Sequence, residues 1–158
     1  MAIVHRSASV VLAILISAIV LVLRAQVGYA QDSEIKAAIE GYHAAIESLD
    51  ISKMEPLWVH ESGVILVNPQ NKNISVGWDA VKKNWEGAFN FFSEIKITQL
   101  DGPYTTIKDD VAWSTGISRA IEKSKAGAGD IDVFETDVFE KRDGRWLLVS
   151  HSARSIPK

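Results

Sequence analysis

The hydrophobic pattern of this chain changes partway along, and this change limits the possible fold more than any other feature. Early apolar residues recur at alternating steps of four and three positions: Ile35, Ile39, Tyr42, Ile46 and Leu49. Such a stripe predicts an amphipathic helix. From Glu94 onward the chain reads as strands separated by turn signals. Helices followed by a long run of strands indicate an α+β fold, with the helices packed on one face of an antiparallel sheet.

Two shorter helices and a hairpin are expected before the main sheet. Ser52 to Glu55 reads as a capping box that opens a short helix, and Asp79 is a candidate cap for a third helix. Between them, strands at 64–67 and 74–76 are predicted to form a hairpin. The remaining strands are expected at 94–100, 104–108, 111–122, 131–141 and 146–154, with turns at 101–103, 109–110 and 143–144.

The first 30 residues have the pattern of a signal peptide. The apolar run Val10–Leu23 would span about 21 Å as a helix, which is short of the roughly 30 Å of a bilayer core. Small residues, Gly28 and Ala30, occupy the positions that a signal peptidase needs. We therefore expect residues 1–30 to be removed and residues 31–158 to form an exported domain, periplasmic or secreted. An uncleaved membrane anchor is the alternative.

Composition excludes several classes of function. The chain has no cysteine, which removes disulfides, thiolate nucleophiles and cysteine metal sites. The formal net charge is −3, and nucleic-acid binding requires clustered basic residues, so nucleic acid is not an expected partner. His43, His60 and His151 do not have the spacing of a metal site. No metal and no cofactor are expected.

The order of elements resembles the nuclear transport factor 2-like superfamily, and within it the SnoaL-like proteins. The local marks are residues 42–50, 77–81, 110–113 and 139–146, and the resemblance covers about residues 34–156. This group includes ketosteroid isomerases, polyketide cyclases and the association domain of calmodulin-dependent kinase. The resemblance implies a curved sheet wrapped around three helices, as a cone-shaped α+β barrel with a pocket. It also implies a homodimer, for which the outer face of the sheet is the expected contact.

The resemblance to the isomerases implies roles for three residues. Tyr42 corresponds to the tyrosine that holds the oxyanion, and Asp137 corresponds to the protonated acid that shares it. The catalytic base of that family precedes a proline, and here Asn68 precedes Pro69. An amide cannot accept a proton near neutral pH, so this base is missing.

Each candidate pocket residue also has a purely structural interpretation. Tyr42 lies on the apolar stripe of its helix and fits a core position. Asp137 fits a solvated sheet face as well as a pocket acid with a raised pKa. Asn68 fits a turn. Trp78 and Trp113 fit a core, or the wall of a pocket for an apolar ligand.

His151 is a further candidate for a general base. A two-residue turn at Asp143-Gly144 pairs Asp137 with Ser150 and Thr136 with His151, so Asp137 and His151 are predicted to face opposite ways. A bulged three-residue turn would reverse this.

Three classes of function remain open. The leading hypothesis is an exported pocket domain that binds a small, partly apolar molecule and has no clear catalytic apparatus. The second is an acid–base enzyme, such as an isomerase, cyclase or dehydratase, with Asp137, His151 or Glu135 as titratable groups. The third is a dimerisation or interaction module. Fold alone cannot choose among them.

Overall fold

The structure is a computed structural model that describes residues 31–157. Residues 31–48 form the first helix. The other elements are α2 (Ile51–Met54), the 3-10 helix η1 (Glu55–Leu57), β1 (Ile65–Val67), β2 (Ser75–Val76), α3 (Trp78–Phe91), β3 (Phe92–Lys108), β4 (Val111–Ser124), β5 (Gly127–Arg142) and β6 (Arg145–Ser155). The predicted signal peptide lies outside the described residues. None of the described helices is long and apolar enough to cross a membrane.

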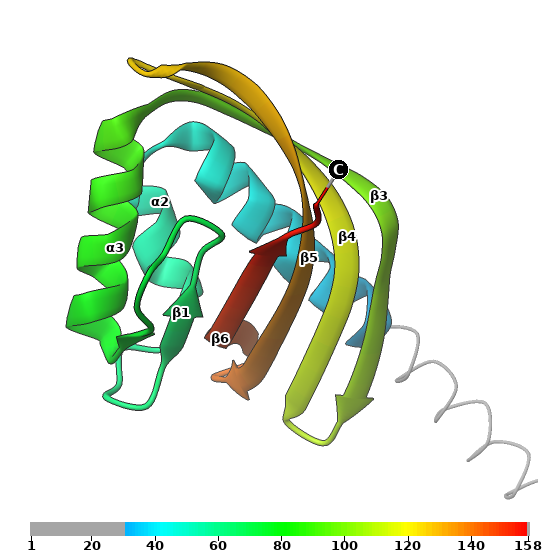
Figure 1. The fold of residues 1–158 in the computed structure, drawn as a ribbon. Helices are drawn as coiled ribbons and strands as arrows, with labels where there is room; N and C mark the ends of the chain where they lie inside the picture. Colours follow the sequence, from blue (N-terminus) through cyan, green and yellow to red (C-terminus); the bar gives the residue numbers. More distant parts are fainter. Residues whose placement is uncertain (1–30, 158) are drawn as a thin grey trace, which may run out of the picture. The chain divides into compact units, whose positions relative to one another are not determined.

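Residues 35–157 lie in one compact unit, which contains a six-stranded sheet. The strand order is β2-β1-β6-β5-β4-β3, so β2 and β3 are open edges and the sheet does not close into a barrel. All neighbouring strands are antiparallel except β1 and β6, which pair in parallel. Figure 1 shows the long strands curving along their length. The expected α+β class is confirmed, with a mixed sheet in place of a purely antiparallel one.

The first helix carries the stripe that its sequence predicts. Ile35, Ile39, Tyr42 and Ile46 are buried and belong to the main hydrophobic core. Leu49 takes a positive φ of 52°, where the helix has ended.

Both predicted helix caps are wrong by about two residues. The N-cap of α2 is Asp50, whose Oδ1 accepts a hydrogen bond from the Ser52 backbone N–H at 2.9 Å. The N-cap of α3 is Gly77, with a φ of 84° that an L-amino acid rarely adopts. Asp79 lies in the first turn of α3, where its charge interacts favourably with the helix dipole.

The predicted turn at residues 101–103 is an irregularity inside one long strand. β3 runs through it, with register shifts between Gln99 and Tyr104. Gly102 has a φ of 83°, and a Cβ there would lie 2.9 Å from the Thr115 carbonyl oxygen. The glycine therefore allows the strand to bend without leaving the sheet.

Candidate functional site

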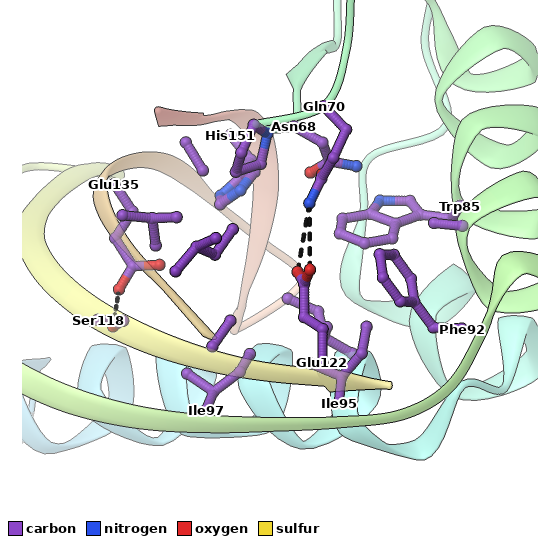
Figure 2. A pocket seen from close by; sticks show the side chains of 17 residues that line it. Asn68, Gln70, Trp85, Phe92, Ile95, Ile97, Ser118, Glu122, Glu135 and His151 are labelled. Atoms are coloured by element: carbon purple, nitrogen blue, oxygen red, sulfur yellow. Dashed lines mark hydrogen bonds between the residues drawn. The ribbon is translucent and has the colours of Figure 1, made fainter. Parts of the chain in front are cut away.

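A cavity lies between the inner face of the long strands and α3 (Figure 2). Its volume is about 70 Å³ for the centres of water-sized molecules, which is room for several of them. Most of its wall is apolar: Ile46, Pro69, Trp85, Ala88, Phe92, Ile95, Ile97, Ala120, Ile131, Val133 and Ala153. The polar lining residues are Asn68, Gln70, Ser118, Glu122, Glu135 and His151.

The space for this cavity comes from small residues on β4. Inward-facing positions alternate along a strand, and on β4 they are Ala112, Ser114, Gly116, Ser118 and Ala120. Ordinary core strands place large aliphatic side chains at such positions. Two of these small residues, Ser118 and Ala120, line the cavity and leave room on the concave face.

Asp137 and His151 form a buried pair at this cavity. His151 Nδ1 lies 2.6 Å from Asp137 Oδ1, and the two residues are 3% and 1% exposed. They are direct register partners across β5 and β6. The prediction that they face opposite ways is wrong, although the predicted Asp143-Gly144 turn is present between Arg142 and Arg145.

A β-bulge in β6 is the reason for this difference. Phe139 pairs with Leu148 and Val138 pairs with Ser150, so Val149 is an extra residue on β6. One extra residue exchanges the two faces of the strand beyond it. The two side chains therefore face the same way, as a bulge in the turn would also have caused. The bulge lies at Val149 in β6, five residues after Gly144 of the turn.

The hydrogen bond to Asp137 fixes the orientation of the His151 ring. It engages Nδ1, and because His151 lines the cavity, Nε2 is the ring nitrogen left for a bound molecule. A carboxylate on one ring nitrogen sets the tautomer and supports the imidazolium that forms when the other nitrogen takes a proton. This pair can therefore accept and return a proton.

Glu135 is a second buried carboxylate, and unlike Asp137 it lines the cavity. Ser118 Oγ donates a hydrogen bond to its Oε1, and His43 Nε2 lies 3.4 Å from its Oε2, an ion-pair distance without hydrogen-bond geometry. Burial alone would raise the pKa of Glu135, but His43, Ser118 and the charge of His151 lower it below its ordinary value. Burial alone would lower the pKa of His43, but Glu135 and the neighbouring carboxylates raise it.

Tyr42 makes an edge-to-face ring contact with His151 and does not line the cavity. It is fully buried, its ring centroid is 5.1 Å from that of His151, and its hydroxyl has no hydrogen-bond partner among the described residues. Burial, followed by the charges of Asp137 and Glu135, raises the pKa of Tyr42 well above its ordinary value. The hydroxyl therefore stays protonated, in a position that matches the core interpretation.

Asn68 lines the cavity and belongs to a chain of hydrogen bonds. Its Nδ2 donates to Asn84 Oδ1 at 3.1 Å, and Asn84 Nδ2 donates to Ser75 Oγ at 3.1 Å. Beyond it, Gln70 Nε2 donates to the Glu122 carboxylate at 3.3 and 3.5 Å (Figure 2). Burial raises the pKa of Glu122 above its ordinary value, and the Gln70 hydrogen bond opposes this.

The two predicted tryptophans lie elsewhere. Trp78 stacks on His60, with ring centroids 4.2 Å apart, and is not part of the cavity wall. Trp113 is 41% exposed and pairs with Val138 on the outer face of the sheet. Among residues 31–157, no three histidine or carboxylate side chains gather where they could hold a metal ion.

The sequence interpretation missed Ser118, Glu122, Gln70 and His43 as members or neighbours of the site. Only one of these had a visible signal: Ser118 lies in the alternating run of small residues on β4. Gln70 and Glu122 are 52 positions apart, and only the fold brings them together.

Comparison with known proteins agrees with this architecture. The SnoaL-like domain family model matches residues 35–157. A proposed dehydratase of the nuclear transport factor 2-like family from Streptomyces avermitilis has a TM-score of 0.76 at 18% identity, over 83% of this chain and 99% of that one. A ketosteroid isomerase-like protein from Erwinia carotovora atroseptica has a TM-score of 0.67 at 18% identity, over 80% and 96%.

A third solved structure has a different assigned role. A proposed association domain of calcium/calmodulin-dependent protein kinase II from Xanthomonas campestris has a TM-score of 0.68 at 21% identity, over 79% of this chain and 87% of that one. No curated protein sequence matches. At these identities the solved structures share the fold, and the family match covers the whole compact unit. The chain belongs to the SnoaL-like domain family, with the nuclear transport factor 2-like fold.

Proposed function

We propose that this protein is an acid–base enzyme that moves a proton on a small, largely apolar molecule held in the cavity. His151 is the general base and acid, and Asp137 is the positioning residue that orients it. The reaction class is isomerisation or dehydration. The observation that carries the proposal is the 2.6 Å contact between two buried residues, one of which lines an apolar cavity.

Physical cost supports a functional interpretation of this pair. Burying ionisable groups is unfavourable, and replacing a buried ion pair by apolar side chains is often neutral or stabilising. Perturbed or paired titratable groups in a cavity are therefore candidates for catalysis. The names of two structural neighbours, a proposed dehydratase and a ketosteroid isomerase-like protein, are in line with this chemistry.

A carbon-acid exchange assay tests the proposal without knowledge of the natural substrate. Cyclohexanone is small and apolar, and removal of its α-protons in D₂O is followed by proton NMR. The wild-type protein should exchange these protons faster than an equal concentration of free imidazole. His151→Gln should reduce the protein-dependent rate by about 100-fold or more, the usual range for loss of a general base.

The matched control is His60→Gln, which removes a histidine that stacks on Trp78 away from the cavity. This variant should exchange like the wild type. Asp137→Asn should lower the rate while the fold is retained, because the amide can still accept a hydrogen bond from Nδ1 but carries no charge. Equal rates for the wild type and His151→Gln would contradict the proposal.

We also propose that the protein acts as a homodimer. The outer face of the sheet exposes Trp113 and Phe134, which are large apolar side chains on neighbouring strands. Exposed apolar patches of this kind are typical of protein contacts. Multi-angle light scattering at micromolar concentration should show a dimer for the wild type and a monomer for Phe134→Lys.

We further propose that the protein is exported and that residues 1–30 are removed as a signal peptide. The basis is the apolar N-terminal run and the small residues before Gln31. Intact-mass measurement of the protein from a periplasmic fraction should give a chain that begins at Gln31, and a mass that includes earlier residues would contradict it.

A further inference from the structure

The charge pattern of the cavity wall limits what can bind there. Among the described residues that line the cavity there is no lysine or arginine, but there are two glutamates, Glu122 and Glu135. His151 lines the cavity and His43 lies beside Glu135, and each of these histidines contacts a carboxylate of its own. Neither histidine is therefore an uncompensated charge that could hold an anion.

The two glutamates have different surroundings. Glu135 is held from both sides, by Ser118 and by His43. Among residues 31–157, the partner of Glu122 is one uncharged amide, that of Gln70, which donates two long hydrogen bonds at 3.3 and 3.5 Å. A new hydrogen-bond donor stabilises a half-buried carboxylate with one weak neutral partner more than it stabilises a carboxylate that is already paired.

The Glu122 carboxylate lies at one end of the cavity. Glu122 pairs with Gly129 and Glu135 pairs with Gly116, so six positions of β4 separate them. That is about 20 Å along a straight strand. The distance across the concave face is shorter because β4 curves (Figure 1). Figure 2 shows Ile95 and Phe92 near Glu122, and His151 beside Asn68 across the cavity.

We propose that the ligand of this cavity is a small apolar molecule with an amine at one end and no negative charge, and that the Glu122 carboxylate binds the amine. The apolar body then extends toward His151. This inference rests on the proposed function and names the substrate class of the same site. Carboxylates and phosphates are excluded because they would meet Glu122 and Glu135 in surroundings of low dielectric constant, with no lysine or arginine on the described wall to offset them.

Three probes of equal framework and different charge test this inference: benzylamine, benzyl alcohol and benzoate. Binding at pH 7 is followed by NMR titration of the Trp85 indole N–H signal, since Trp85 lines the cavity. We expect benzylamine to bind at least tenfold more tightly than benzyl alcohol, and benzoate at least tenfold more weakly. Equal affinity for the three probes, or no binding of benzylamine, would overturn the inference.

Two variants separate the role of Glu122 from the general acidity of the protein. Glu122→Gln should remove the preference for benzylamine over benzyl alcohol. Glu94→Gln is the matched control, because Glu94 precedes Ile95, the register partner of Glu122, and pairs with Lys123 away from the cavity. This control should keep the full preference for the amine. If it lost the preference as Glu122→Gln does, long-range charge would be the cause and the inference would fail.

The same probes distinguish this inference from the proposed function. His151→Gln should abolish cyclohexanone exchange and keep the order amine, alcohol, acid. If that order holds while exchange does not depend on His151, the proposed function fails and the ligand class stands. If exchange depends on His151 while the three probes bind alike, the ligand class fails and the proposed function stands.

Discussion

Filling the cavity should separate ligand binding from folding. Ala120 lies on the cavity wall and on a strand, so Ala120→Ile places a side chain with high strand propensity into the empty space. The change adds three carbon atoms. At about 0.8 kcal/mol for each buried methylene, burial can contribute at most about 2.4 kcal/mol of stability. Overpacking typically costs about 1–3 kcal/mol and opposes this gain.

The net change in the free energy of unfolding should therefore stay within about 2 kcal/mol of the wild type. Urea unfolding followed by tryptophan fluorescence measures it. Binding of benzyl alcohol and exchange of cyclohexanone should both fall by more than tenfold, because the isoleucine fills part of the cavity that these molecules would occupy.

Thr98→Ile is the matched control for this experiment. Thr98 is exposed and pairs with Arg119, so the same residue type is added to the opposite face of the sheet. It should affect neither binding nor exchange. If Ala120→Ile folded normally and still bound benzyl alcohol like the wild type, the cavity would not be the ligand site.

Three further expectations follow from the site. The pKa of His43 is raised above 6.5 and that of Glu135 is lowered below 4.5, so their contribution to stability is lost as pH rises through the His43 value or falls through the Glu135 value. Urea midpoints should therefore show this contribution at its greatest between about pH 4.5 and 6.5, and His43→Gln should flatten the alkaline side. Tyr42→Phe should leave stability and exchange nearly unchanged, because the hydroxyl has no hydrogen-bond partner within the described part of the chain; a large loss of exchange would instead favour the oxyanion role. The wild type should isomerise a β,γ-unsaturated ketosteroid poorly, judged by ultraviolet absorbance of the conjugated product. Asn68→Asp should raise that rate if the Asn68 amide occupies the place of the catalytic base. A wild-type rate like that of a true isomerase would contradict the expectation of poor activity.

The parts of the fold that depend on local pattern could be predicted from the sequence. The helical stripe of residues 35–49 and the Asp143-Gly144 turn are both local signals, since side-chain spacing and turn chemistry act over a few residues. The caps of α2 and α3 were misplaced because several cap-competent residues lie side by side, and tertiary packing decides among them.

The site depends on contacts that no short pattern encodes. Asn68 and His151 line one cavity because β1 lies beside β6, a parallel pairing between distant segments. Trp113 was misjudged as a pocket candidate because an aromatic residue on a strand can face either side, and only the register places it outward. The pairing of Gln70 with Glu122 likewise follows from sheet curvature, which no local spacing reveals.

The bulge at Val149 leads to a last prediction, since it takes one extra residue out of the ladder and so keeps Asp137 opposite His151. With Val149 present, the ladder passes from Phe139–Leu148 to Val138–Ser150. Deleting Val149 joins these two pairs directly, so Asp137 still faces His151 in a regular ladder and exchange of cyclohexanone should persist. A single alanine inserted after Val149, with the one-residue bulge kept, pairs Ser150 with Asp137 and turns His151 to the outer face, with a loss of exchange similar to that of His151→Gln. Loss of exchange in a folded deletion variant would show that the bulge does more than set the register, for example by fixing the angle at which the imidazole enters the cavity.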